Sequence, residues 1–289
     1  MSIFIGKDSR VIIQGITGRD GSFHSKRMHD YGTNVVGGVS PGKGGQAVSG
    51  LPVFDTVVES IKKTNADTSV IFVPGRCAAS AIDEAIEAGI KNIIVITEGV
   101  PIHETVKLVE KSQMLGSRII GPNTPGLISP GKVLAGIIPP QIVKPGRIGV
   151  VSRSGTLTYQ VISELTAVGL GVSTAVGAGG DPIIGTSLID VAHAFERDDE
   201  TDAIVMVGEI GGNDEQHVAN AYKKTICKPI ISFIAGVFAP PQKRMGHAGA
   251  IISGNGMTAI NKIDALEDAG IKVARLVWDI PELLKKEID

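Results

Sequence analysis

Short apolar runs rich in β-branched residues alternate along this chain with longer segments of helical periodicity. This alternation is typical of βα units, in which parallel strands are joined by helical crossovers. It predicts an α/β protein with two doubly wound parallel sheets, one in each half of the sequence. The expected strands lie at residues 11–14, 34–39, 69–73, 92–97 and 118–121 in the first half, and at residues 147–152, 171–177, 203–212, 228–236 and 271–277 in the second.

The length of 289 residues fits two domains. Six prolines and several glycines fall between residues 121 and 147, a stretch in which we expect no regular element. We place the domain boundary inside it. The prediction is a Rossmann-like domain at residues 1–125, a Pro/Gly-rich connection at residues 126–146 and a flavodoxin-like, doubly wound parallel-sheet domain at residues 147–289.

Composition restricts the classes of function. Hydrophobic residues make up 43% and charged residues 20%, which predicts a globular chain with ample apolar surface to bury. The formal net charge of −2 provides no broad basic field, so nucleic acid and anionic membranes are disfavoured as partners. No apolar run is long enough to span a bilayer. Two cysteines and a start without an apolar signal core favour a reducing, cytoplasmic setting.

The first functional candidate is the turn after the strand at residues 11–14, where Gly15, Gly18 and Gly21 open a helix that runs towards Tyr31. Small residues allow the backbone to approach a pyrophosphate, and a helix N-terminus presents N–H groups to it. The pattern therefore predicts a nucleotide site in the first βα unit. The alternative is a glycine-rich strand-to-helix turn without a ligand.

Lys43 indicates which nucleotide this site would hold. An NAD site usually has an Asp or Glu at the end of the second strand, whereas this strand runs into the sequence VSPGKGG. A lysine there suits a phosphorylated ribose, as in NADP or coenzyme A, although a solvated loop lysine is an equal alternative. The segment from Gly37 to Lys43 also resembles the phosphate loop of nucleoside triphosphatases. Gly44 replaces the Ser or Thr that would ligate magnesium, so we reject that interpretation.

The second half offers a possible anion site and a carboxylate. The sequence VVSRSGTLTY again joins a strand to a helix, with Ser152 and Ser154 able to cap and Gly155 able to admit an anion. Ordinary capping explains the two serines almost as well. Glu209 ends an apolar strand, at the edge of a sheet where ligand sites usually lie. It could equally be a solvated strand-end carboxylate.

His247 stands among glycines and alanines in the sequence KRMGHAGAIISGN, which follows the strand at residues 228–236. A neutral imidazole can act as a nucleophile towards phosphorus when a carboxylate, such as that of Glu209, holds its other ring nitrogen. Flanking glycines would leave room for a transferring phosphoryl group. The alternative is a loop histidine on a flexible surface turn.

Seven motifs stand in the order and at the spacing of one family. They are GITGRDGSFH, VGGVSPGKGG, ITEGVP, GPNTPG, VSRSGTLTY, GEIGG and RMGHAGAII. Through them the whole chain resembles the alpha subunit of succinyl-CoA synthetase, also called succinate–CoA ligase. One departure is Thr124, which stands where many family members have a cysteine. The resemblance implies a ligase of the tricarboxylic acid cycle that interconverts succinyl-CoA, phosphate and a nucleoside diphosphate with succinate, CoA and a nucleoside triphosphate.

The resemblance also implies roles for particular residues. The first domain would bind coenzyme A rather than NADP, through Thr17, Gly18, Arg19, Asp20, Lys43, Ile96, Thr97 and Glu98. His247 would be transiently phosphorylated, with Glu209 as its carboxylate partner. The helix N-terminus at Ser154, Gly155 and Thr156 would receive the phosphohistidine, and Tyr159 would lie near the acyl substrate.

An obligate beta subunit, in a heterodimer or a heterotetramer, is a further implication of the resemblance. The chain has no recognisable nucleotide-grasping site or magnesium ligands, so the beta subunit would bind Mg and ATP or GTP. Two alternatives stay open. One is a sibling ligase for another acid, such as malate–CoA ligase, and the other is a non-catalytic protein that binds CoA or a dinucleotide.

Overall fold

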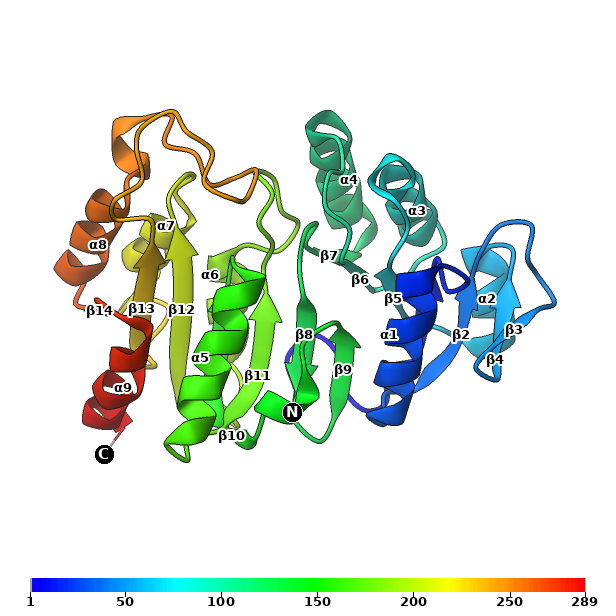
Figure 1. Cartoon of the computed structure of the whole chain (residues 1–289), viewed down its shortest axis with the longest axis horizontal. Helices are drawn as coiled ribbons and strands as arrows, with labels where there is room; N and C mark the ends of the chain where they lie inside the picture. Colours follow the sequence, from blue (N-terminus) through cyan, green and yellow to red (C-terminus); the bar gives the residue numbers. More distant parts are fainter. Residues whose placement is uncertain (1, 289) are drawn as a thin grey trace. The chain divides into compact units, whose positions relative to one another are not determined.

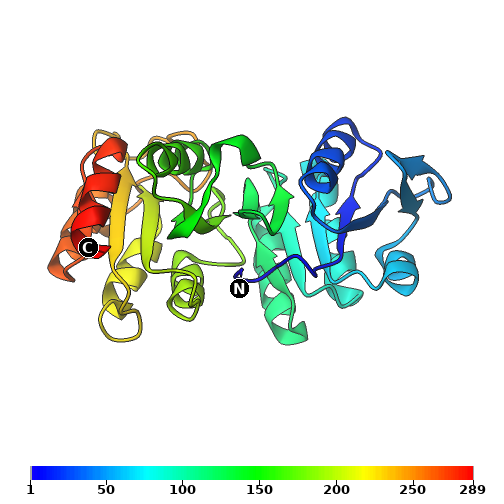
Figure 2. The ribbon, with the colours of Figure 1, turned by 90° about the horizontal axis from the view of Figure 1, so that it is seen from below.

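The computed structural model describes residues 2–288, which divide into two compact units. The first unit runs from Phe4 to Ile138 and includes Ile183–Gly185. The second unit comprises residues 2–3, Pro139–Pro182 and residues 186–288. Each unit has an α/β fold with helices on both faces of a mainly parallel sheet (Figure 1, Figure 2), as the alternating sequence pattern predicted.

The strands and helices of the first unit that build its sheet layers are, in chain order, β1 (Val11–Gln14), α1 (Arg19–Asp30), β2 (Val35–Val39), β3 (Ala47–Val48), β4 (Leu51–Phe54), α2 (Val57–Thr64), β5 (Thr68–Ile71), α3 (Gly75–Glu87), β6 (Asn92–Val95), α4 (Ile102–Leu115) and β7 (Arg118–Ile120). The strand order is β3-β4-β2-β1-β5-β6-β7. The strands pair in parallel except β3, which forms a short antiparallel pair with β4. Without β3, this is the strand order of the Rossmann fold.

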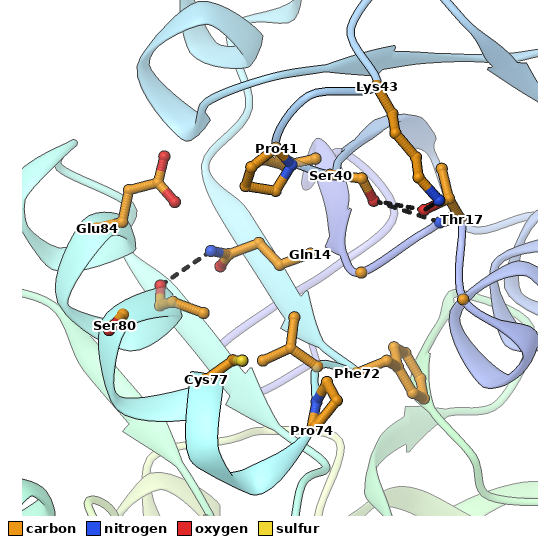
Figure 3. A pocket seen from close by; sticks show the side chains of 15 residues that line it. Gln14, Thr17, Ser40, Pro41, Lys43, Phe72, Pro74, Cys77, Ser80 and Glu84 are labelled. Carbon is orange, nitrogen blue, oxygen red and sulfur yellow. Dashed lines mark hydrogen bonds between the residues drawn. The ribbon is translucent and has the colours of Figure 1, made fainter.

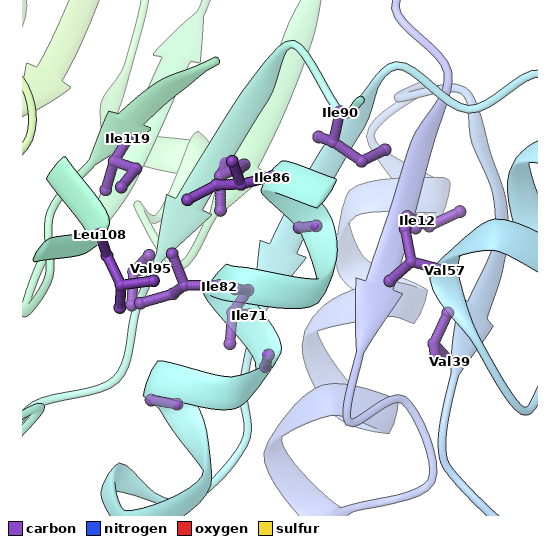
Figure 4. Close-up of a cluster of buried hydrophobic side chains, with 14 of the residues drawn as sticks. Ile12, Val39, Val57, Ile71, Ile82, Ile86, Ile90, Val95, Leu108 and Ile119 are labelled. Carbon is purple, nitrogen blue, oxygen red and sulfur yellow. The ribbon is translucent and has the colours of Figure 1, made fainter. Parts of the chain in front are cut away.

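Helix α1 lies on one face of this sheet, and α2, α3 and α4 lie on the other (Figure 2). An apolar cluster fills the space between the sheet and the second group of helices (Figure 4). Helix α3 contributes most to it, because its buried side chains recur at helical spacing along one face. They are Ala78, Ala81, Ile82, Ala85 and Ile86. This burial holds α3 against the sheet beside the cavity described below.

Residues 126–136 form a hairpin of two antiparallel strands, β8 (Gly126–Ser129) and β9 (Val133–Gly136). The expectation of no regular element in this proline-rich stretch was wrong here. The prolines lie outside the two strands, where their missing N–H groups interrupt no ladder. The hairpin is fixed beside the end of α1, where Thr33 donates a hydrogen bond from Oγ1 to the Leu134 carbonyl at 2.8 Å.

The second unit contains η1 (Pro140–Ile142), β10 (Pro145–Ser152), α5 (Gly155–Ala167), β11 (Val172–Gly177), α6 (Leu188–Glu196), β12 (Ala203–Glu209), α7 (Asp214–Ala221), β13 (Ile230–Ala235), η2 (Asn255–Met257), α8 (Ala259–Asp268), β14 (Lys272–Ala274), η3 (Val277–Asp279) and α9 (Ile280–Ile288). Its parallel strands follow the order β14-β13-β12-β10-β11. This is the flavodoxin-like order. Strands β11 and β12 are buried along their whole length, and β12 is accordingly apolar up to its final residue, Glu209.

Both sheets contain a point at which successive crossovers leave in opposite directions. In the first sheet it lies between β1 and β5, and in the second between β10 and β12. Ligands of open α/β sheets bind outside the carboxyl ends of the strands at such switch points. Between residues 2 and 288, no helix is both long enough and apolar enough to cross a membrane.

Candidate functional site

A cavity of about 450 Å³ opens at the switch point of the first sheet (Figure 3). This volume is in the usual range for small-molecule sites. The walls come from the loops after β1, β2 and β5 and from the beginning of α3. The lining residues are Gln14, Gly15, Thr17, Gly18, Val39, Ser40, Pro41, Lys43, Phe72, Val73, Pro74, Cys77, Ser80, Ala81 and Glu84.

A buried amide forms the floor of this cavity. Gln14 ends β1 and is only 2% exposed. Its Oε1 accepts a hydrogen bond from Ser69 Oγ at 2.7 Å. Its Nε2 donates to the Ala81 carbonyl at 2.9 Å (Figure 3). These bonds join β1, β5 and α3, so the floor is fixed by satisfied polar contacts.

Hydroxyl groups and one ammonium group lie at the rim. Thr17 Oγ1 and Ser40 Oγ are 3.0 Å apart, and Lys43 Nζ donates to Thr17 Oγ1 at 3.3 Å (Figure 3). These residues belong to the loops after β1 and β2, which meet here. Such a group of donors is suited to the oxygen atoms of a phosphate.

Glycines allow the loop after β1 to turn tightly into α1. Gly15 has φ of +86°, which favours a residue without a Cβ atom. A Cβ atom on Gly21 would lie 2.2 Å from the Gly15 carbonyl oxygen, so α1 could not approach β1 with a larger residue there. Gly18 caps α1 without a side-chain hydrogen bond. The helix N-terminus beside the cavity is therefore suited to an anion.

The residues predicted for coenzyme A binding fall into three groups. Thr17, Gly18 and Lys43 line the cavity. Arg19 and Asp20 begin α1, are largely exposed and pair with each other at 3.0 Å. Ile96, Thr97 and Glu98 follow β6 at the same edge of the sheet but do not line the cavity. Thr97 Oγ1 donates at 2.7 Å to the carbonyl of Val73, a lining residue.

The His24 ring packs against Phe72, a residue that lines the cavity. The two rings stack, with centroids 5.4 Å apart and planes 7° from parallel. Burial lowers the pKa of His24, and the nearby Arg27 lowers it further. The imidazole is therefore neutral at pH 7 and packs against the cavity wall as an aromatic ring.

The second unit brings His247 and Glu209 together. Glu209 is the last residue of β12, and His247 lies in the loop between β13 and α8. His247 Nδ1 and Glu209 Oε2 are 2.7 Å apart, with side chains 27% and 8% exposed. A Cβ atom on Gly180 would lie 2.6 Å from Cγ of His247, so a glycine after β11 makes room for the imidazole. The carboxylate can hold the ring in one orientation and tautomer.

Arg153 connects this pair to the start of α5. Its Nε lies 3.5 Å from Glu209 Oε1, its Nη1 bonds Asp214 Oδ2 at 2.9 Å, and its Nη2 donates to the Asp181 carbonyl at 2.9 Å. The Arg153 side chain is only 7% exposed. It supplies a fixed positive charge beside the buried carboxylate.

Helix α5 begins at Gly155, two residues after this arginine. Ser154 is its N-cap and accepts a hydrogen bond from the Leu157 N–H at 3.3 Å. Gly155 and Thr156 form the first turn, and the partly buried Tyr159 lies one turn further along. Because Arg153 precedes the cap and contacts Glu209, the helix N-terminus lies at the same carboxyl edge as the His247–Glu209 pair.

Sequence reasoning did not single out several members of these sites. In the second unit they are Arg153, Gly180, Asp181 and Asp214, and in the first they include Gln14, Ser40 and Phe72. A polar residue at the end of the apolar run VIIQ could have drawn attention to Gln14. Between residues 2 and 288, no group of three or more His, Cys, Asp and Glu side chains is arranged to hold a metal ion.

Two family descriptions match the chain. Residues 6–99 match the family described as CoA binding domain, and residues 151–272 match the family described as CoA-ligase. The cavity lies in the first of these regions. The His247–Glu209 pair lies in the second.

Relatives match over nearly the whole sequence. The subunit alpha 2 of a succinate–CoA ligase [ADP-forming] from Archaeoglobus fulgidus is 53% identical over 98% of this chain and 99% of its own. Alpha subunits of the same description from Aquifex aeolicus and Staphylococcus aureus are 51% and 52% identical, over 99% and 98% of this chain and 94% of each relative. These matches confirm the resemblance predicted from the seven motifs.

Solved structures share the fold. An ATP citrate lyase from Methanosaeta concilii in complex with (3S)-citryl-CoA superposes with a TM-score of 0.91 at 26% identity, over 99% of this chain and 50% of that one. A dinucleotide-forming acetyl-coenzyme A synthetase from Ca. Korarchaeum cryptofilum has a TM-score of 0.77 at 23% identity, over 98% of this chain and 61% of that one. The second likeness concerns the fold alone.

Proposed function

Because the chain belongs to the family of succinate–CoA ligase alpha subunits, we propose that it works as such a subunit in an enzyme that interconverts succinyl-CoA, phosphate and ADP with succinate, CoA and ATP. The choice of ADP rests on the names of these three relatives. The alternatives of another acid or a non-catalytic binding protein are addressed by the experiments below.

The contact between His247 Nδ1 and Glu209 Oε2, at 2.7 Å, carries this proposal. An imidazole held by a carboxylate through one ring nitrogen has the other nitrogen in a defined direction, as a nucleophile requires. We assign the attack on phosphorus to Nε2, because Glu209 engages Nδ1. The nearby N-terminus of α5 would stabilise the charge of the transferred phosphoryl group.

The reaction would proceed in three reversible steps. Phosphate attacks the thioester carbonyl of succinyl-CoA and releases the CoA thiol, giving succinyl phosphate. His247 Nε2 then attacks phosphorus and releases succinate. The phosphohistidine finally passes its phosphoryl group to ADP, which gives ATP and restores the neutral imidazole. Each step breaks one bond and forms one, so the transfer potential of the thioester is retained in the phosphoanhydride.

Coenzyme A would bind in the cavity of the first unit. The pyrophosphate would lie at the N-terminus of α1, beside Thr17 and Gly18, both of which line the cavity. Lys43 Nζ, 3.3 Å from Thr17 Oγ1, would contact the ribose phosphate.

A beta subunit would bind ADP or ATP together with Mg, since the chain carries neither a triphosphate loop nor, among residues 2–288, a metal-binding cluster. The complex would be a heterodimer or a heterotetramer. The free thiols of Cys77 and Cys227 are both exposed, which suits a reducing cytoplasm.

Phosphorylation of His247 is the decisive test. The chain, co-purified with a beta subunit from the same source, is incubated with radiolabelled MgATP and examined for acid-labile, base-stable phosphate on His247. We expect the label in the wild type, its removal by succinate plus CoA, and its absence in His247→Asn, which should still bind CoA. A folded complex that takes no label from ATP, GTP or succinyl-CoA with phosphate would favour the binding-protein alternative. Faster removal of the label by malate plus CoA than by succinate plus CoA would identify malate as the acid substrate.

A further inference from the structure

A lysine and a glutamate are completely buried behind the proposed phosphohistidine site. Lys262 lies on α8 and Glu215 on α7, and both side chains are 0% exposed. Their ammonium and carboxylate groups form an ion pair and a hydrogen bond.

This pair binds the main chain of Glu209 on both sides. Lys262 Nζ donates to the Glu209 carbonyl at 2.7 Å and to the Gly211 carbonyl at 2.5 Å. Glu215 Oε1 accepts the N–H of Glu209 at 3.0 Å. With the bond to Glu215, all three donors of the ammonium group are used. One buried ion pair therefore holds both polar main-chain groups of the residue that contacts His247.

The chain around Glu209 leaves room for the carboxylate of Glu215. A Cβ atom on Gly208 would lie 2.3 Å from Glu215 Oε1. Directly after Glu209 the strand ends, and Gly211 and Gly212 turn with φ of +86° and +60°. The strand end thus lacks a continuing ladder. It is held by the ion pair and by a hydrogen bond from the Gly211 N–H to the Met257 carbonyl at 2.9 Å.

A contribution to the stability of the fold does not by itself explain why Lys262 and Glu215 are buried here. Removing two charges from water is costly, and apolar replacements of buried ion pairs are often neutral or stabilising. Directed hydrogen bonds, in contrast, fix the position of a strand end to within a few tenths of an ångström. The Glu209–His247 contact of 2.7 Å depends on that position.

We propose that Lys262 and Glu215 are positioning residues for phosphoryl transfer, which act by holding the Glu209 main chain so that its carboxylate orients His247. This inference rests on the proposed function. The pair touches no substrate atom in the relay and acts only through Glu209. Its removal should therefore lower kcat and leave the KM values for succinate and CoA nearly unchanged.

The principal variant is Lys262→Met combined with Glu215→Gln, which removes both charges together and keeps an oxygen that can accept the Glu209 N–H. In the complex with the beta subunit, we expect kcat and the rate of His247 labelling to fall by about 10-fold to 100-fold, as for misplaced catalytic groups. The KM values should change by less than about 2-fold. The matched control is Lys286→Met with Glu282→Gln, an exposed pair on α9 at 2.7 Å, which should leave kcat unchanged.

A double-mutant cycle separates positioning from general destabilisation. In a Glu209→Gln background, removal of the buried pair should have little further effect on kcat, because the residue through which the pair acts is already altered. Multiplicative losses in kcat would overturn the proposal, as would an unchanged labelling rate in a folded variant.

Glu215→Asp provides a second variant if the double substitution prevents assembly. It keeps both charges but shortens the carboxylate by one methylene, so it cannot reach Lys262 and the Glu209 N–H together. We expect a lower kcat with unchanged KM values, and an unchanged kcat would reject the inference. A wild-type complex that takes no label would instead reject the proposed function, so the two failures are distinguishable.

Discussion

Arg153 Nε and Glu209 Oε1 face each other at 3.5 Å at the carboxyl edge of the second sheet, and the two side chains are 7% and 8% exposed. Among the described residues, neither of these two atoms has a hydrogen-bond partner. The other guanidinium nitrogens bond Asp214 and the Asp181 carbonyl. The arginine is thus held by two other groups while its charge lies beside the carboxylate that orients His247.

Arg153→Lys should therefore slow phosphorylation of His247. Lysine keeps the charge but has no planar fork, so it cannot contact Asp214, Asp181 and Glu209 together. We expect labelling of the complex by MgATP to slow by about 10-fold, the cost of a modest misplacement of a catalytic group. Arg147→Lys, at an exposed arginine on β10, the strand that Arg153 follows, is the control and should label at the wild-type rate. Equal rates for both variants would show that Arg153 has no part in the relay.

Gly180→Ala should displace the His247 ring. The added Cβ atom would lie 2.6 Å from Cγ of the imidazole, a distance that real Cβ contacts do not show, so the ring must move away. We expect the labelling rate to fall by at least about 10-fold, with CoA binding by the first unit unchanged. Gly254→Ala is the matched control in the second unit, because no atom lies within 4 Å of the added methyl group. Wild-type labelling of Gly180→Ala would contradict the observed packing of His247.

Lys43→Ala should reduce the discrimination between coenzyme A and dephospho-CoA. If Lys43 contacts the ribose phosphate, its loss should weaken CoA binding by about 10-fold, the usual effect of one hydrogen bond to a charged group. Binding of dephospho-CoA, which lacks that phosphate, should hardly change. Calorimetric titration of both ligands measures the difference. Lys62→Ala, at an exposed lysine on α2 outside the cavity, is the control. Equal weakening for both ligands would place Lys43 elsewhere on the nucleotide.

Hydrophobic pattern predicted most of the fold because each parallel strand is a short apolar run between turn residues. The strand predicted at residues 11–14 coincides with β1. The strand predicted at residues 203–212 ends earlier, at Glu209, because Gly211 and Gly212 leave the extended conformation. The hairpin of β8 and β9 was missed because its short strands lie between prolines, whose positions outside the ladder depend on tertiary packing.

The candidate site was predictable only where local sequence carries a chemical signal. The bare glycine and alanine surroundings of His247 and the strand-end position of Glu209 are visible along the chain. The role of Lys262 is not visible in the sequence, because this residue lies in an ordinary helical pattern and bonds the Glu209 carbonyl from 53 residues away. Only the packing of α8 beside the sheet buries its ammonium group. Gly180 makes room for a ring far away in sequence, so its role likewise depends on the folded structure.

The ion pair between Arg147 and Asp202 should make part of the stability depend on pH. Arg147 donates to Asp202 through Nε and, at 2.6 Å, through Nη2. These hydrogen bonds hold the pKa of Asp202 below its usual value. Because the unfolded carboxyl group titrates near its ordinary value of about 4, the pair stabilises the fold above that pH. Its contribution is lost as the pH falls through the lower folded pKa.

Asp202→Asn tests this sign. At pH 7 the variant should melt about 2 °C or less below the wild type, since exposed pairs contribute little. The difference should shrink below about pH 4, where the wild-type carboxylate also becomes neutral. Asp199→Asn, an exposed neighbour that pairs with Arg147 only through its carbonyl, is the control and should show no such trend. Thermal unfolding followed by circular dichroism between pH 3 and pH 7 gives the comparison, and a gap that widens on acidification would reverse the assigned sign.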